Sequence, residues 1–218
     1  MSRQATSSRP LLSLGRALLA ALVASTLGTL VAGCAGNQAA FTDVRYDLGP
    51  LEAQAAPAAS ASPALPPLKV LEVSAPPPLD NDGILYRISG DAQRESRYAN
   101  SRWAMSPARL LTQRLRSSLA SRATVLSGAD AVPAPMLKVE LNEFEQVFDS
   151  ATSSSGVLAA RATLMQGGKV IAQRSFIARA PASSPDAAGG AAALRAASDD
   201  FAGQIGTWLS GQALAGTP

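Results

Sequence analysis

The sequence predicts an α+β fold in which a largely antiparallel sheet carries two amphipathic helices on one face. Three observations support this prediction. Strand-like runs come first, a helix follows, and further strands precede a second helix near the C-terminal end. Apolar residues alternate with polar ones in the strand-like runs and recur every three or four positions in the helical ones. About 130 ordered residues are enough to build one hydrophobic core of this kind.

The first half of the predicted sheet consists of three short strands. Residues 44–48 alternate between apolar and polar side chains, and residues 68–74 and 84–88 are rich in apolar and β-branched residues. Residues 50–67 consist mostly of alanine and proline. Because proline denies hydrogen bonds to a sheet and the segment has almost nothing to bury, we expect a flexible insertion there.

The first helix is expected to begin at Ser106 and Pro107. Serine can cap a helix, and proline suits the first helical position. Apolar residues then recur at four-residue spacing, which predicts one buried face. The residues assigned to that face are Ala104, Ala108, Leu111, Leu115 and Leu119.

The second half of the sheet begins with residues 137–141, whose alternation predicts a strand with one solvated face. Phe144 breaks this alternation, so a bulge or bend is expected near Asn142 and Glu143. Two further strand-like runs flank Gly167 and Gly168. A Gly-Gly turn between such runs predicts a hairpin, because the turn requires positive φ.

The last predicted element is an amphipathic helix over residues 191–210. Its large apolar residues follow spacings of three and four, which places them on one face. The residues of this face are Leu194, Ala197, Phe201, Ile205 and Trp208.

Composition excludes several classes of function. The chain has 218 residues, with 19 basic and 16 acidic side chains, one cysteine and no histidine. Arg3, Arg9 and Arg16 are the only charged residues before Cys34, so the remaining chain has equal numbers of basic and acidic groups. A neutral domain lacks the clustered basic groups that nucleic acids require. Without histidine, histidine-based catalysis and histidine metal sites are excluded, and one cysteine allows no intrachain disulfide.

The N-terminal segment has the layout of a secretory signal. Three arginines precede an uncharged run that ends in Leu-Val-Ala-Gly-Cys at residues 30–34. This pentapeptide resembles the lipobox of bacterial lipoproteins, which implies that the Cys34 thiol is acylated and becomes the new N-terminus. Residues 1–33 are then the signal peptide and residues 34–42 a tether. Fully extended, the tether spans only about 30 Å, so the domain would lie close to its membrane.

The polar clusters of the sequence do not predict an enzyme. The Gly-Gly-Lys triplet at residues 167–169 lacks the spacing of a phosphate-binding loop. The four acidic residues at positions 140, 143, 145 and 149 alternate with apolar ones, which favours a solvated strand face over a metal or catalytic site. No serine and lysine have the spacing of a Ser-Lys nucleophile. We therefore expect no catalysis, no cofactor and no metal.

Aromatic and arginine residues gather before the first helix, a composition that is enriched at interface hot spots. This pattern makes them candidates for partner binding, with core packing and helix-end contacts as the alternative. The candidates are Tyr86, Arg87, Arg102 and Trp103, with Tyr98 nearby.

Taken in order, these motifs resemble the ABC-type transport auxiliary lipoproteins, the PqiC-like family. The resemblance covers nearly the whole chain after residue 34, and the long insertion at residues 50–67 is a departure from it. The matching segments are the lipobox, Tyr46 to Leu48, Val73 to Asp80, Ile84 to Arg87, Trp103 to Pro107, Leu137 to Phe144, the Gly-Gly hairpin and the helix ending in Trp208 and Leu209.

The resemblance implies one domain over residues 43–212, followed by a disordered tail at residues 213–218. It also implies a lipid-anchored protein on the periplasmic face of the outer membrane, since Ala35 rather than aspartate follows Cys34. Its partner would be the mammalian-cell-entry-type protein of an ABC system that moves lipid or other hydrophobic molecules. The lipoprotein would bind this partner as a monomer or as a homo-oligomer.

Two alternatives stay open from the sequence. One is a stand-alone envelope lipoprotein that assists outer-membrane or cell-wall assembly. The other is a domain that itself carries lipid in an apolar pocket between helices and sheet.

Overall fold

The structure is a computed structural model that describes residues 43–50, 65–88 and 93–214. The predicted signal peptide and tether lie outside the described residues, as do most of the predicted insertion and the last four residues of the tail. The elements are β1 (Val44–Tyr46), β2 (Leu68–Val70), η2 (Pro77–Leu79), β3 (Gly83–Ile88), β4 (Glu95–Trp103), α2 (Pro107–Leu119), β5 (Val125–Leu126), β6 (Met136–Phe148), β7 (Ser154–Gln166), β8 (Lys169–Pro181) and α3 (Ala187–Ser210).

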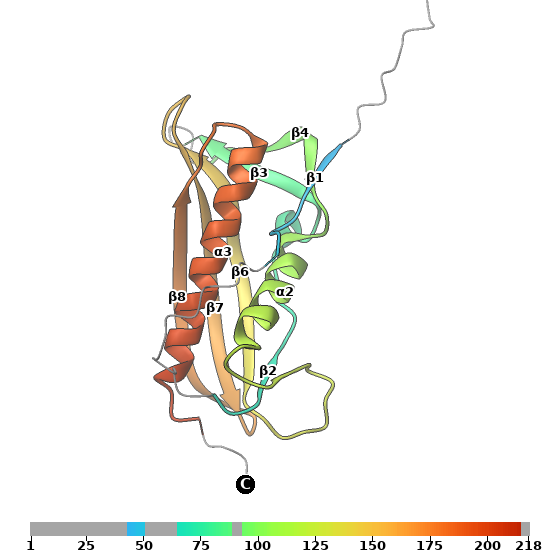
Figure 1. The fold of residues 1–218 in the computed structure, drawn as a ribbon, viewed down its shortest axis with the longest axis vertical. Coiled ribbons are helices and arrows are strands. Elements are labelled where there is room, and N and C mark those ends of the chain that lie inside the picture. Colours follow the sequence, from blue (N-terminus) through green and yellow to red (C-terminus); the bar gives the residue numbers. More distant parts are fainter. Residues whose placement is uncertain (1–42, 51–64, 89–92, 215–218) are drawn as a thin grey trace, which may run out of the picture. The chain divides into compact units, whose positions relative to one another are not determined.

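Three long antiparallel strands form the main part of the sheet. β6, β7 and β8 have 13 residues each and pair in sequence order. The other edge of β6 is shared by two groups of short strands (Figure 1). β3 pairs in parallel with the C-terminal end of β6 and leads to β4 and β1, while β2 pairs in parallel with its N-terminal end and leads to β5. No parallel pairing exceeds four residues, so the sheet is largely antiparallel, as predicted.

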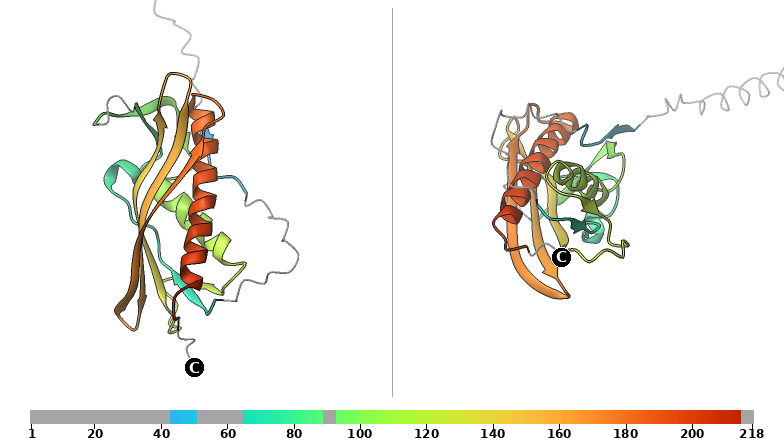
Figure 2. Two further views of the ribbon diagram at one scale, coloured as in Figure 1. Left: turned by 90° about the vertical axis from the view of Figure 1, so that its left-hand side faces the viewer. Right: turned by 60° about the horizontal axis from the view of Figure 1, so that its bottom comes forward.

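Both helices cover the same face of this sheet (Figures 1 and 2). α3 lies along β7 and β8, and α2 lies beside α3 on the side of β2. The predicted face of α3 is buried in full, with Leu194, Phe201 and Ile205 each at zero exposure. Phe176 of β8 holds this contact from the sheet side, with its ring centroid 5.8 Å from that of Phe201. The predicted α+β class is confirmed.

Two local features of the sheet were predictable from single residues. The register of β6 against β7 shifts between Leu141 and Glu143, where the bulge was expected. The shift lets both Leu141 and Phe144 face the core, at 1% exposure each. The hairpin between β7 and β8 turns at Gly167 and Gly168, with φ values of 56° and 78°. A side chain at either position would be strained, which explains the Gly-Gly pair.

α3 begins four residues before the predicted start. Asp186 caps it by accepting a hydrogen bond from the Gly189 amide at 2.8 Å. The first turns consist of alanine and glycine, so they carry no periodic signal. They approach the sheet closely because β7 has Gly156 beneath them: a Cβ at Gly156 would lie 2.6 Å from the backbone of Ala193 and Leu194.

The structure corrects two predictions for the first helix, the cap at Ser106 and the burial of Ala104. Pro107 occupies its first turn as predicted, but the Ser106 side chain makes no capping hydrogen bond, and its hydroxyl is buried without a partner among the described residues. Ala104 is exposed, because it precedes the helix and belongs to the turn after β4. Ala108, Leu111, Leu115 and Leu119 are buried as expected. Thr112 is also buried, and its hydroxyl accepts a hydrogen bond from the Val73 amide.

The strands of the first half also differ from the prediction. The run at residues 68–74 is regular only over Leu68–Val70, and Ser74 then makes a single bridge to Glu140. β4 was not predicted at all. Only its last residue, Trp103, is buried, so the strand shows no alternation that sequence analysis could detect. Its conformation is imposed by antiparallel pairing with β3.

No helix within the described ranges is long and apolar enough to cross a membrane.

Candidate functional site

The four residues predicted to bind a partner lie on the β3 and β4 strands but do not form one surface. Tyr86 and Arg87 are neighbours near the end of β3, so their side chains point to opposite faces of the sheet. Arg102 and Trp103 lie at the far end of β4. Each of the four has a partner within the fold.

Trp103 belongs to the hydrophobic core. Its side chain has zero exposure, and its ring centroid lies 5.4 Å from that of Phe144 on β6. A fully buried ring has no surface to offer a partner. The interpretation as a partner-binding residue is therefore corrected to the alternative, core packing.

Tyr86 is part of a partly exposed aromatic cluster at one end of the sheet. Its ring centroid lies 4.9 Å from that of Tyr98 and 6.0 Å from that of Phe148. The Tyr98 hydroxyl donates to Gln146 Oε1 at 2.8 Å, and Gln146 in turn donates to the Ser154 hydroxyl. Burial, together with the nearby Asp186 charge, raises the pKa of Tyr98 to about 12. The phenol is therefore a fixed hydrogen-bond donor, not an acid that functions near neutral pH.

Arg87 points to the opposite face of the sheet from Tyr86, where two carboxylates hold it. Its Nε donates to Glu145 Oε1 at 2.8 Å, and a second carboxylate, that of Glu95, lies 3.9 Å from Nη2. This hydrogen bond raises the pKa of Arg87 above its ordinary value. Glu145 is buried, which the expectation of a solvated acidic face did not foresee. Its burial follows from the parallel pairing of β3 with β6, which places Leu85 beside it.

Arg102 ties β4 to the residue that precedes β1. Its Nε lies 3.7 Å from Asp43 Oδ2, and its Nη1 donates to the Tyr98 carbonyl at 3.0 Å. The side chain is part-buried and about a third exposed, at 31%. Arg102 therefore holds the start of the described domain and still reaches solvent.

Two further acidic residues of the cluster, Glu140 and Asp149, form ion pairs, and Glu143 is exposed. Glu140 accepts from Arg161 Nε at 2.8 Å and from Lys138 at 3.0 Å. The Arg161 hydrogen bond is the main cause of a lowered pKa of Glu140. Asp149 pairs with Arg179 at 3.3 Å. Within the ranges that the structure describes, no three metal-ligating side chains gather into a candidate metal site.

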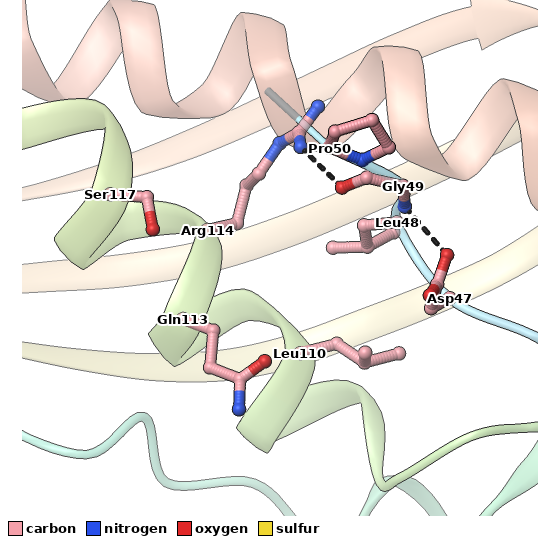
Figure 3. Close-up of a pocket in the computed structure, with 8 residues that line it drawn as sticks. All are labelled: Asp47, Leu48, Gly49, Pro50, Leu110, Gln113, Arg114 and Ser117. Atoms are coloured by element: carbon pink, nitrogen blue, oxygen red, sulfur yellow. Dashed lines mark hydrogen bonds between the residues drawn. The ribbon is translucent and has the colours of Figure 1, made fainter. Parts of the chain in front are cut away.

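A first pocket lies between α2 and the segment that follows β1 (Figure 3). It has a volume of about 250 Å³ and is lined by Asp47 to Pro50 and by four residues of α2. Arg114 points from α2 toward this segment and donates to the Gly49 carbonyl at 3.0 Å. Its other partner is Asp199 on α3. Arg195, also on α3, donates to the next carbonyl, that of Pro50, at 3.2 Å.

Through these contacts, the residues of the pocket clamp the segment after β1 against both helices. Asp47 accepts from the Gly49 amide at 2.8 Å, and Gly49 has φ of 64°, so the segment forms a tight turn. Arg114 is only 4% exposed and is already bonded on two sides. Its charge is used to hold the segment against both helices. Sequence analysis placed Arg114 on neither helix face and missed this role.

A second, larger groove runs between β8 and the C-terminal half of α3. Its volume is about 540 Å³. Phe176 and Trp208 lie at its base with ring centroids 5.7 Å apart, and Arg174 lies on the β8 side. The α3 side consists of small and polar residues: Asp200, Gly203, Gln204, Thr207, Gly211 and Gln212. The β8 strand beside it pairs with β7 alone among the described strands, so its other edge carries no described strand.

The groove was missed because its residues carry no pattern in the sequence. Gly203 and Thr207 look like the ordinary exposed face of an amphipathic helix. Only the strand order shows that this face adjoins a sheet edge. The spacing of residues 200, 203, 204 and 207 places them on one helix face near Trp208, but this spacing does not indicate a groove.

Solved structures share this fold at low sequence identity. A crystal structure of a protein from Xanthomonas campestris is 21% identical, has a TM-score of 0.62 and covers 70% of this chain and 88% of its own. A crystal structure of an uncharacterized protein is 18% identical, with a TM-score of 0.60, and covers 77% of this chain and 99% of its own. A minor lipoprotein from Acinetobacter baumannii is 17% identical, with a TM-score of 0.42, over 72% of this chain and 99% of its own. A comparison with curated proteins finds no match.

The family follows from the sequence match. The model of the ABC-type transport auxiliary lipoprotein component matches residues 46–206, which is most of the chain. The chain belongs to this family, and the predicted resemblance is confirmed. It is accordingly an auxiliary lipoprotein of ABC-type transport, associated with a transport system of the cell envelope.

Proposed function

We propose that the protein is a periplasmic adaptor, anchored in the outer membrane through acylated Cys34, that docks the mammalian-cell-entry-type protein of its transport system. The observation that carries this proposal is the family match over nearly the whole folded domain, combined with a lipobox at residues 30–34. In such a system the ATPase performs the chemistry. The lipoprotein has only to hold the conduit at the membrane.

The distances available to the chain support this role. From Cys34 to the first described residue, Asp43, the tether is nine residues long and spans at most about 30 Å. Acylation by two or more chains holds a protein stably at a bilayer. Ala35 favours export to the outer membrane by its resemblance to other lipoproteins. The domain would then stay within one short tether length of the outer membrane.

The chemistry of the domain supports binding over catalysis. Among the described residues, the buried charged groups are engaged in structural contacts: Arg114 with Gly49 and Asp199, and Glu145 with Arg87. The aromatic side chains between α3 and the sheet fill the interface with ring contacts of 5.7 and 5.8 Å. We therefore propose that the domain has no enzymatic activity of its own and acts through its surface.

Co-purification tests the proposal. The full-length lipoprotein, carrying an affinity tag at its C-terminal end, is expressed in its own bacterium and extracted with mild detergent. We expect mass spectrometry to identify the mammalian-cell-entry-type protein in the eluate. We also expect membrane fractionation to place the lipoprotein in the outer-membrane fraction. A reproducible eluate without that protein would favour the stand-alone envelope lipoprotein. Neighbouring genes for an ATPase, a permease and a mammalian-cell-entry-type protein favour transport.

A further inference from the structure

We propose that the groove between β8 and α3 binds an extended segment of the partner protein, which adds to the sheet as a further strand beside β8. The segment carries a carboxylate side chain opposite Arg174 and an apolar side chain over Phe176 and Trp208. The inference rests on the proposed function for the identity of the partner, and it adds the surface and the mode of binding.

The first support is the edge of β8 itself. The strand has 13 residues, and no described strand pairs with its outer edge. Proline occurs only at its last position, Pro181, so the edge keeps its amides along almost the whole length. Proteins commonly blunt such edges with proline, short strands or covering elements. An exposed row of amides and carbonyls is the surface to which an extended peptide adds.

The second support is the groove on the helix side of this edge. Successive residues of an added strand would alternate between the groove and the open face of the sheet. In the groove they would meet Phe176 and Trp208 at the base and Gly203 on the helix, where a Cβ would contact nothing within 4 Å. On the open face they would meet Ile177, which is 70% exposed. Both rows of side chains therefore have an apolar contact.

One β8 carbonyl already turns to the helix for a partner. The Gln204 amide donates to the Ile177 carbonyl at a distance of 3.4 Å, which is long for a hydrogen bond. The same amide donates to Asp200 at 2.9 Å. An added strand could supply a shorter hydrogen bond to the carbonyl while Gln204 keeps its contact with Asp200.

The charges of β8 decide between the two kinds of occupant. The strand has Lys169, Arg174 and Arg179 and no acidic residue. Arg179 pairs with Asp149. Two copies paired through β8 would still bring together the Lys169 and Arg174 side chains of both, and like charges directly opposite each other are destabilising. Arg174 lies 5.1 Å from the Phe176 ring centroid, and no described carboxylate pairs with it. These charges favour a partner segment that contains carboxylates over a second copy of this chain.

The test fills the groove without straining the helix. Gly203→Trp places a large side chain in the groove, and Gly203→Ala is the matched control that leaves it open. The full-length variants are used to capture the mammalian-cell-entry-type protein from detergent extracts of the same bacterium. We expect Gly203→Ala to capture as much as the wild type and Gly203→Trp to capture less by about tenfold or more. Circular dichroism and thermal melting confirm that both variants are folded.

A second pair tests the charge. Arg174→Glu reverses the charge beside the groove, and Arg109→Glu makes the same change at an exposed position on α2. We expect capture to fall with Arg174→Glu only. In the wild-type complex, hydrogen exchange of the β8 amides should slow relative to the free lipoprotein, because an added strand would bond to them.

The outcomes separate the two proposals. Capture by the wild type, with equal capture by folded Gly203→Trp and Arg174→Glu, overturns the groove inference and leaves the adaptor function standing. No capture by the wild type overturns both. In a third outcome, the free wild-type protein forms dimers in which the β8 amides are protected from exchange, while Gly203→Trp forms none. This result would show that a second copy occupies the groove, and it would also overturn the inference.

Discussion

At the scale of single residues, the most consequential side chain of the domain is Arg114. It is the one charged residue of α2 that is buried, and it joins three parts of the chain: α2, α3 through Asp199, and the turn after β1 through Gly49. Arg195 adds a second bond to this turn from α3. The turn after the first strand is thus attached to the helical layer by two guanidinium groups.

We predict that Arg114→Ala lowers the free energy of unfolding by about 2–4 kcal/mol, because it leaves the Gly49 carbonyl and the Asp199 carboxylate without their partner. Urea denaturation followed by circular dichroism measures the change. Arg109→Ala, at an exposed position of the same helix, is the control and should cost less than about 0.5 kcal/mol. Equal effects of the two substitutions would show that the clamp contributes nothing.

Glu140 gives a pH-dependent contribution. Its pKa is lowered from the ordinary value of 4.5 by hydrogen bonds from Arg161 and then Lys138, so the folded state binds its proton less tightly than the unfolded state. The stabilisation is fully present above pH 4.5 and is lost as the pH falls through the lowered folded pKa. We predict that Glu140→Gln reduces stability near neutral pH by no more than about 1 kcal/mol, since the pair is at the surface.

Thermal melting of the wild type and Glu140→Gln across pH 3 to 7 measures this effect. The two melting temperatures should differ at pH 7 and converge at the acid end. A difference that persists unchanged to pH 3 would mean that the ion pair is not its origin.

At the scale of elements, the position of α3 requires glycine at position 156 and does not require it at position 203. Gly156 of β7 leaves room for the α3 backbone, whereas Gly203 faces open space. Both are glycines in regular structure, and sequence analysis treats them alike. The contact decides which of them is required.

We predict opposite effects of alanine at these two glycines. Gly156→Ala should destabilise the domain by about 1–3 kcal/mol, because the new Cβ would lie 2.6 Å from backbone atoms of α3 that must then shift. Gly203→Ala should stabilise it by about 0.5–1 kcal/mol through better helix propensity. Chemical denaturation of both variants gives the signs, and a stabilising Gly156→Ala would contradict the close approach.

The sheet is the element where pattern and structure agree least. β7 and β8 pair as the Gly-Gly turn predicts, while β4 was missed and β2 is shorter than its apolar run. β4 has one buried residue among nine. A strand held mainly by backbone pairing leaves no hydrophobic period in the sequence, and the neighbours that impose it are distant along the chain.

At the scale of the whole molecule, we expect the proposed anchor and the described domain to be separable. The described residues begin at Asp43, and the buried core that they form runs from Leu48 to Leu209. Removing the anchor should therefore change location and not fold.

We predict that Cys34→Ser removes the protein from the outer-membrane fraction and that the protein carries no acyl chain. The reason is that the thiol to which the lipid attaches is absent. Membrane fractionation and intact-mass analysis measure the change, and the purified domain should keep the wild-type circular dichroism spectrum. Membrane retention of Cys34→Ser in full would contradict the lipid anchor.

The sequence by itself determined the α+β class, the bulge near Asn142, the Gly-Gly hairpin, the buried face of α3 and the family. Each is a local signal: a period, a glycine pair or a motif order that needs no knowledge of distant residues. Tertiary structure alone decided that Trp103 is core, that Glu145 is buried beside Leu85 and that Arg114 holds the turn after β1. It also decided that the edge of β8 next to α3 pairs with no described strand. These features depend on which strands and helices become neighbours, and burial and pairing energies between distant segments settle that choice.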